Sequence, residues 1–297
     1  MTIFEAIIQG IIQGLTEFLP VSSSGHLSLF QYFTGRSTAY GMLFMVLLHV
    51  GTLLAVFIAF RKTIWILILE SGAMLRDIFT GKFTLKDMPP YRRMVVLQIV
   101  ALLPMGLVFF LTDIFDSIAA DQDIVIEGFA FMFTSYLLFL AIRAIKKGGK
   151  KKTAGEMTYF DALAMGAIQA IAPIPGISRS GSTIAVGLMR GLDRKFAIEF
   201  SFIMSLPTVI GATLMYTVRS WDEVTAFAPS VLVVGILVSL VFGLIAIRLL
   251  KMLVLSDKFK YLAWYTLILG IAVVVIGIFE HIAGQPIQAA VMRLFGS

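Results

Sequence analysis

An apolar segment near the start of the chain recurs, in altered form, in its second half. Residues 4–26 read FEAIIQGIIQGLTEFLPVSSSGH, and residues 160–182 read FDALAMGAIQAIAPIPGISRSGS. Each copy predicts an apolar helix, a break rich in Pro, Gly and Ser, and a second apolar stretch. The duplication predicts one domain, residues 1–297, made of two repeats at about residues 1–150 and 155–297. The ungapped alignment pairs Phe4 with Phe160, Gly10 with Gly166, Gln13 with Gln169, Ser22 with Ser178, Ser24 with Ser180 and Gly25 with Gly181.

The repeats lie in a chain with about six apolar runs that are each long enough to cross a bilayer. The chain is 59% hydrophobic and only 14% charged, with a mean hydropathy of +0.93. A soluble helical core would need polar helix faces that these runs lack. We therefore expect an all-α polytopic membrane protein, and the absence of cysteine excludes thiol chemistry. The runs lie near residues 41–60, 94–112, 124–142, 196–217, 229–249 and 261–280.

The charged residues predict the orientation of this protein in the membrane. Segment 113–123 carries four aspartates and neither Lys nor Arg. The positive-inside rule places the basic loops in the cytoplasm and both termini outside. A nucleic-acid partner is not expected, because the cations flank the apolar runs and do not form one face. Most of the 24 basic residues lie in segments 61–93, 143–152, 190–195 and 248–260.

The orientation has a consequence for the two repeats. If segments 4–34 and 160–190 dip into the membrane and return, each repeat contributes an odd number of full spans. The second repeat then has inverted topology, and the two re-entrant helical hairpins meet near the midplane around a polar pocket. Region 63–90 does not fit this scheme, since it has no equal-length counterpart and predicts a short amphipathic helix at 64–75.

The first break carries a carboxylate at membrane depth. Glu5, Gln9, Gln13 and Glu17 recur every four residues and so share one helical face. Glu5 and Gln9 are interpreted as a packing stripe that ends at the membrane interface. Glu17 lies deepest, shortly before Pro20. An ionisable residue at this depth is costly, and we therefore place Glu17 in a functional site.

Clustered hydroxyl groups follow Glu17. Residues Ser22, Ser23, Ser24, Gly25 and His26 can supply a nucleophile and its base, or hydrogen-bond donors to an anion. A structural role for His26 is an equal alternative.

The second break places a cation at the equivalent position. Arg179 stands in the segment PGISRSGST, residues 175–183, which contains no acidic residue. A guanidinium and the backbone N–H groups of a following helix form a suitable cradle for phosphate. The alternative is an ion pair between Arg179 and Glu17, which would join the two breaks. An oxyanion, phosphate above all, fits this set of side chains best, and a carboxylate beside it suggests a divalent metal.

Two motifs carry a resemblance to a known family. The segment QGLTEFLPVSSSGH, from Gln13 to His26, resembles the (E/Q)xxxE motif and the Ser-Gly-His segment of bacterial undecaprenyl-diphosphate phosphatases of the bacitracin-resistance type. The segment from Pro175 to Thr183 is similar to the PGxSRSxxT motif of that family. The resemblance covers essentially the whole chain, and two motifs at the family's separation make it specific.

The resemblance implies hydrolysis of undecaprenyl diphosphate to the monophosphate lipid carrier of cell-wall synthesis. It implies a site open to the outer face of the bacterial inner membrane and a divalent cation, Mg²⁺ or Ca²⁺. Glu17 would hold the metal with Gln13, and Arg179 would neutralise the diphosphate. Ser23 and His26 would be the nucleophile or proton-transfer groups, and which of them attacks phosphorus stays open. The residues implied to contact phosphate are Ser22, Ser24, Ser178, Ser180 and Thr183.

Two positions depart from the family's pattern. Gln13 stands where many members have Glu, so the site has one carboxylate fewer, and metal affinity is expected to be lower. His49 stands where many members have Gln, and it is a candidate to act behind the primary site residues. The alternative function is a transporter or flippase of a polyprenyl phosphate, which needs an anion cradle but no nucleophile or metal ligand. A homodimer is one hypothesis for the oligomeric state.

Overall fold

The computed structural model describes residues 1–34, 39–109, 123–149 and 151–284. The described residues are helical and contain no β-strand beyond an isolated bridge between Lys152 and Leu192. The first half contains α1 (Ile3–Phe18), α2 (Ser23–Phe33), α3 (Ala39–Ala59), α4 (Arg61–Phe79), α5 (Pro90–Leu102), α6 (Met105–Phe109) and α8 (Ile124–Lys147). The second half contains α9 (Tyr159–Ala170), α10 (Arg179–Met189), α11 (Arg194–Arg219), α12 (Trp221–Thr225), α13 (Pro229–Leu255) and α14 (Lys260–Ala283).

Four helices of the described residues are long and apolar enough to cross a membrane. They are α8, α11, α13 and α14, and the bent pair of α3 and α4 raises the number to five. The chain is therefore an integral membrane protein. The apolar run near 94–112 is not one continuous helix, because α5 ends at Leu102, before Pro104, and residues 110–112 lie outside the described residues. Pro104 has no backbone N–H to continue the helical hydrogen bonds, which explains this break.

The predicted amphipathic helix at 64–75 is confirmed, but it is longer than expected. It forms α4, which starts after Phe60 at an angle of 86° to α3. Its apolar residues Trp65, Ile68 and Leu69 are exposed. The second half has only the short α12 at the corresponding place, which agrees with the absence of an equal-length counterpart.

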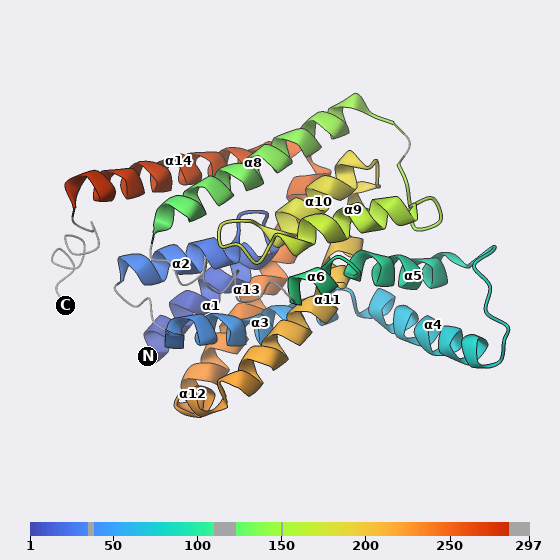
Figure 1. The fold of residues 1–297 in the computed structure, drawn as a ribbon, viewed down its shortest axis with the longest axis horizontal. Coiled ribbons are helices and arrows are strands. Elements are labelled where there is room, and N and C mark those ends of the chain that lie inside the picture. The colour runs from blue at the N-terminus through green and yellow to red at the C-terminus, as the bar shows by residue number, and fades with distance from the viewer. Residues whose placement is uncertain (35–38, 110–122, 150, 285–297) are drawn as a thin grey trace.

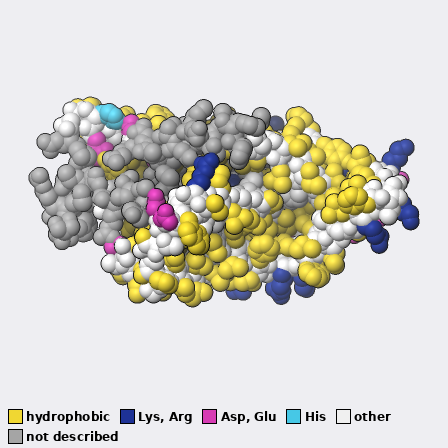
Figure 2. Space-filling model, turned by 60° about the horizontal axis from the view of Figure 1, so that its bottom comes forward, with side chains coloured by type: hydrophobic (Ala, Val, Ile, Leu, Met, Phe, Trp, Pro, Cys, Tyr) yellow, Lys and Arg dark blue, Asp and Glu magenta, His cyan; other side chains and the backbone are white. Residues whose placement is uncertain are grey.

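Apolar and charged side chains separate on the surface. In Figure 2, hydrophobic side chains dominate the middle of the face in view, and Lys and Arg side chains project at its right-hand end and along its lower edge. Figure 1 shows α4 and α5 at this end, whereas the N-terminus and the end of α14 lie at the other. A broad apolar surface with basic side chains at its margins is what a bilayer requires of a spanning protein.

The two hairpins, α1–α2 and α9–α10, have the same local structure. α1 begins with a capping box between Thr2 and Glu5, and α9 begins with one between Thr158 and Asp161. In such a box the threonine hydroxyl and the acidic side chain satisfy each other's backbone N–H groups at the helix start. The sequence repeat is thus also a repeat of the helix start, although α9 ends at Ala170, four positions before the counterpart of Phe18.

The second helix of each hairpin begins at an equivalent serine. The Ser22 hydroxyl accepts a hydrogen bond from the N–H of Gly25 at the start of α2. The Ser178 hydroxyl accepts one from the N–H of Gly181 at the start of α10. Serine is among the best N-caps because its oxygen satisfies an N–H that the helix leaves free.

Ion pairs fix the start of the second hairpin. Asp161 is fully buried and accepts hydrogen bonds from Lys152 at 2.9 Å and from Arg190 at 2.7 Å. Burial alone would raise the pKa of this carboxyl, but hydrogen bonds from the Thr158 N–H and the two cations outweigh it and lower the pKa to about 2. Asp161 is therefore ionised at neutral pH, and it ties α9 to the end of α10.

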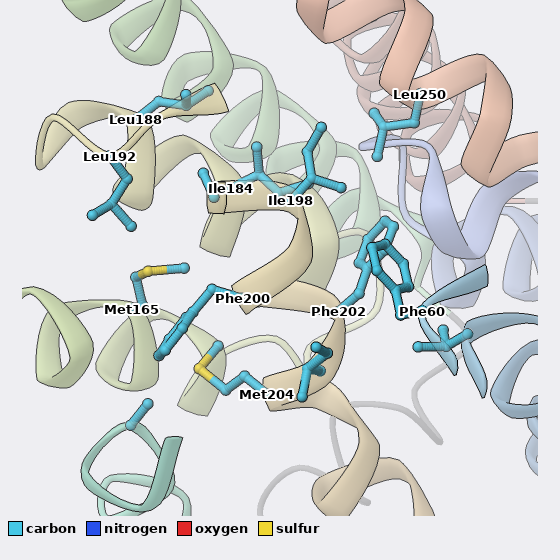
Figure 3. Packing of buried hydrophobic residues seen from close by; sticks show 14 of the residues in the cluster. Phe60, Met165, Ile184, Leu188, Leu192, Ile198, Phe200, Phe202, Met204 and Leu250 are labelled. Atoms are coloured by element: carbon cyan, nitrogen blue, oxygen red, sulfur yellow. The ribbon is translucent and has the colours of Figure 1, made fainter. Parts of the chain in front are cut away.

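The main core joins helices from both halves of the chain. Figure 3 shows Phe200 and Phe202 of α11 inside it, with Phe60 beside Phe202. The rings of Phe60 and Phe202 are in edge contact, with their centroids 5.8 Å apart. The ring of Phe18 in α1 contacts Phe202 in the same way, with a centroid distance of 5.2 Å. Edge-on aromatic pairs of this kind pack favourably. Because Phe18 directly precedes the first break, this core holds the break in place.

Candidate functional site

The breaks of the two hairpins contact each other. The Ser180 hydroxyl donates to the backbone oxygen of Glu17 at 3.1 Å, and the Ser22 hydroxyl donates to that of Ile177 at 3.4 Å. A Cβ on Gly25 would lie 2.9 Å from the Cα of Gly176, so the two backbones need a glycine at this crossing. The two Ser-rich breaks are therefore in contact, while the inverted topology and the polar pocket near the midplane stay predictions.

Glu17 is the centre of the polar contacts at this crossing. One carboxylate oxygen, Oε1, accepts a hydrogen bond from the guanidinium of Arg179. The other, Oε2, accepts from the Gln13 amide at 2.9 Å and from the Ser23 hydroxyl at 2.6 Å, and it lies 3.5 Å from Nε2 of His49. The Glu17 carboxylate is thus buried with partners on both oxygens, as a charge at membrane depth requires.

The contact between Arg179 and Glu17 is the alternative that the sequence left open for this arginine. It joins the first residue of α10 to the penultimate residue of α1. The Arg179 side chain is 22% exposed, against 6% for Glu17. The guanidinium therefore keeps an accessible part, and its five donors exceed what one carboxylate oxygen can use.

His26 has partners other than the neighbouring Ser23. Its Nδ1 lies 2.7 Å from the backbone oxygen of Ser22, and its Nε2 lies 2.7 Å from the hydroxyl of Tyr265 in α14. A backbone oxygen only accepts, so Nδ1 carries the proton; in the neutral ring, Nε2 then accepts from Tyr265. No hydrogen bond joins His26 to Ser23 in the described part of the chain, so the nucleophile–base pair considered for this cluster is not formed.

The contact with Tyr265 leads to a testable prediction. Tyr265→Phe removes the donor to His26 but keeps the ring that stacks on the imidazole at 5.8 Å. We expect a loss of activity of about threefold to tenfold, since a hydrogen bond of this kind contributes about 1 kcal/mol. The check is kcat for Tyr265→Phe beside the exposed Tyr261→Phe, which should retain full activity. An unchanged kcat in Tyr265→Phe would contradict a role for this contact.

The remaining hydroxyl groups predicted to contact phosphate differ in their surroundings. Ser22 and Ser24 lie 3.3 Å apart, and Ser24 is half-buried. Ser178 and Ser180 are buried and lie 3.4 Å apart. Thr183 is also buried, and its hydroxyl lies 2.5 Å from that of Ser201 and 2.8 Å from the backbone oxygen of Arg179. Thr183 therefore positions the first turn of α10 in this structure and does not face an open space.

Sequence reasoning missed two polar residues that border the site. The Tyr265 hydroxyl holds His26, as described above. The Thr134 hydroxyl of α8 donates to the backbone oxygen of Gly176 at 3.1 Å and accepts from the N–H of Ser178 at 3.0 Å. Each lies in an apolar run and is followed by another hydroxyl residue, Ser135 after Thr134 and Thr266 after Tyr265. A polar side chain in such a run is a signal for a buried contact, but it does not name the partner.

The donor set fits a divalent cation only in part. Among the described residues no three His, Asp or Glu side chains form a group that could hold a metal. Glu17 is the carboxylate that Gln13 contacts at the crossing, and the amide oxygen of Gln13 is fully buried without a hydrogen-bond partner in the described residues. Mg²⁺ commonly uses one or two carboxylates together with substrate phosphates. Glu17 and Gln13 fit such an ion when phosphate supplies the other ligands.

His49 lies within reach of the site. Its Nδ1 lies 3.0 Å from the backbone oxygen of Met45, and this contact assigns the proton to Nδ1. Its Nε2 faces Glu17, so the contact of 3.5 Å is attractive when the ring is protonated on both nitrogens. His49 therefore contacts Glu17 directly.

The fold and the site define a class: an all-helical integral membrane protein with an arginine–carboxylate centre between two helical hairpins. The chain belongs to the family of bacitracin resistance protein BacA, whose sequence model matches residues 6–272.

Three relatives are similar to this chain over nearly their whole length. The undecaprenyl-diphosphatase of Alkaliphilus metalliredigens (strain QYMF) is 39% identical over 277 residues, which cover 92% of this chain and 98% of the relative. The undecaprenyl-diphosphatase of Rubrobacter xylanophilus is 38% identical over 268 residues, covering 89% and 94%. The undecaprenyl-diphosphatase of Syntrophotalea carbinolica is 37% identical over 272 residues, covering 91% and 97%.

Proposed function

We propose that this protein is an undecaprenyl-diphosphatase, which hydrolyses undecaprenyl diphosphate to undecaprenyl phosphate. Its membership of the BacA family and the names of its relatives support this activity. We assign the activity to particular residues because Glu17 contacts both Arg179 and Ser23. A cation, a carboxylate and a hydroxyl then meet at one point between the hairpins.

These residues have distinct roles in the proposed reaction. Arg179 binds the diphosphate and neutralises charge on the phosphoryl oxygens, which is the main demand of phosphoryl transfer. Ser23 is the nucleophile, and Glu17 at 2.6 Å takes its proton as the Ser23 oxygen bonds to the terminal phosphorus. The bond from that phosphorus to the bridging oxygen breaks, and undecaprenyl phosphate leaves. Water then hydrolyses the phosphoserine and releases phosphate.

His26 is assigned to proton transfer in the second step. The Tyr265 hydroxyl orients the ring before the reaction, and Nε2 then takes a proton from the attacking water in place of that contact. A divalent cation, Mg²⁺ or Ca²⁺, held by Glu17 and the amide oxygen of Gln13, would supply further charge neutralisation at the phosphate oxygens. Ser22 and Ser24 are proposed to donate hydrogen bonds to the same oxygens.

The membrane placement follows from the charges and the repeat. We place the basic ends of the helices in the cytoplasm, both termini outside, and the second repeat inverted relative to the first. The site then opens to the outer face of the bacterial inner membrane. The lipid tail can stay in the bilayer while the diphosphate head reaches the crossing.

The experiment that tests the function is phosphate release from undecaprenyl diphosphate by the purified protein in detergent. Release by the unmodified chain and its loss in Ser23→Ala are the expected results. Thr34→Ala serves as the control at the end of the same helix, because the Thr34 hydroxyl bonds to backbone oxygens of that helix. If Ser23→Ala keeps full activity and His26→Ala loses it, the nucleophile is His26. A folded protein that binds the lipid but releases no phosphate would favour the transporter or flippase.

Position 13 gives a prediction about the metal. Gln13→Glu adds a second carboxylate beside Glu17, and we expect it to lower the metal concentration needed for half-maximal activity by about tenfold. The measurement is activity against free Mg²⁺ or Ca²⁺ after removal of metal with EDTA. Gln9→Glu, one turn earlier on the same face, is the control. Activity that resists EDTA in both variants would exclude the metal.

A further inference from the structure

A second charged cavity lies away from the hairpin crossing. It has a volume of about 460 Å³ and lies where α3, α4, α11 and α13 meet. Four cations and one carboxylate contribute to its lining: Arg61, Lys62, Lys195, Lys251 and Glu199. None of these residues belongs to the site described above.

The four cations of this cavity outnumber its carboxylate, Glu199, and form no close ion pair in the described part of the chain. Within the described residues, none of the four lies within 4.0 Å of a carboxylate. Arg61 donates to the backbone oxygen of Ile58, and the Lys251 ammonium lies 4.2 Å above the ring of Phe60. Glu199 accepts a hydrogen bond from Thr63. The cavity therefore has a strong positive excess, and it attracts an anion.

The position of the cavity indicates where the anion comes from. α3 ends at Ala59, α13 ends at Leu255, and α11 begins at Arg194, so three apolar helices all reach their basic ends here. This is the level at which a spanning protein meets lipid headgroups. Beside the cavity, Trp65 and Ile68 of α4 are 62% and 53% exposed, and they offer an apolar surface to an acyl chain.

From these contacts we infer that the cavity binds the phosphate of an anionic phospholipid of the surrounding leaflet. Basic pockets between membrane helices are suited to such headgroups, because several cations share one phosphate and the acyl chains remain in the bilayer. The lipid would rest against both α4 and α11, and so would hold the bend between α3 and α4. The inference does not depend on the chemistry at the hairpin crossing.

The test is lipid binding to the purified full-length protein, measured by native mass spectrometry with phosphatidylglycerol or phosphatidylcholine. We expect phosphatidylglycerol to bind about tenfold more tightly. The triple variant Lys62→Gln, Lys195→Gln, Lys251→Gln, called the cavity variant, should lose this preference. The matched control Lys82→Gln, Lys86→Gln, Lys147→Gln removes the same charge from exposed positions and should keep it. Arg179→Ala should also keep it, which separates this cavity from the crossing.

A second variant makes the cavity more positive instead of less, so its expected effect, tighter binding, cannot result from loss of folding. Glu199→Gln removes the one carboxylate among the described residues that line the cavity, and this variant should bind phosphatidylglycerol more tightly than the parent. A rise in melting temperature with inorganic phosphate alone, lost in the cavity variant, would support the site with free phosphate as its source. An equal preference for phosphatidylglycerol in the cavity and control variants would overturn the inference, and so would no response to either phosphate source.

Discussion

Arg179→Ala is expected to lower kcat/KM for undecaprenyl diphosphate by about a thousandfold, or about 4 kcal/mol of transition-state stabilisation. Among the described residues, Arg179 is the one Arg or Lys residue that contacts Glu17, and phosphoryl transfer depends on neutralisation of the phosphoryl oxygens. Arg179→Lys should recover part of the loss, because it keeps the charge but not the planar fork of donors. The measurement is steady-state phosphate release in detergent.

Two controls separate chemistry from folding in this experiment. Arg179→Ala leaves Glu17 buried without its ion-pair partner, which is itself destabilising. The double variant Arg179→Ala, Glu17→Gln removes the unpaired charge and should fold better, yet stay inactive. Arg143→Ala removes an exposed cation of α8 and should keep full activity. Near-normal turnover in Arg179→Ala would show that this residue does not act on the phosphate.

Gly166→Ala is expected to destabilise the protein by about 3 kcal/mol, a loss typical of severe overpacking. A Cβ on Gly166 of α9 would overlap the backbone oxygen of Ala101 in α5. A backbone atom cannot turn aside as a flexible side chain can, so α9 must move away from α5. The measurement is thermal unfolding in detergent, where the midpoint should fall by several degrees.

A second glycine provides the matched control. Gly211 lies within α11, and a Cβ there would meet no atom within 4 Å. Gly211→Ala should therefore be neutral or stabilising by about 0.5–1 kcal/mol, because alanine has the higher helix propensity. Equal effects of both substitutions would mean that the contact between α9 and α5 does not contribute to stability.

The repeat explains why much of the site could be predicted. Ser22 and Ser178 both become N-caps, and the breaks that precede α2 and α10 both contact the opposite hairpin. Such local structure depends on residues that are near each other in the sequence, such as a serine three residues before a glycine N–H. The sequence also limited Arg179 to two partners, a phosphate or Glu17, since a charge at membrane depth needs a partner.

The hydrogen-bond partners of His26 and Thr183 could not be predicted from the sequence. Ser23 and His26 are close in sequence, but Ser23 turns to Glu17 and His26 turns to Tyr265. Thr183, predicted to contact phosphate, bonds to Ser201 and to its own helix. These side-chain contacts depend on how separate helices pack, and the hydrophobic pattern of a sequence does not specify which polar side chains come into contact.

The sequence by itself determined that this chain is a helical membrane protein with two related interrupted hairpins, and it indicated the residues of the site. Apolar length, proline and glycine positions, and serine caps act within a few residues of the chain, so they can be read without a structure. Only the tertiary structure decided that Arg179 reaches Glu17, that Tyr265 holds His26, and that four cations border a second cavity. These contacts join residues far apart in the chain, and helix packing alone brings them together.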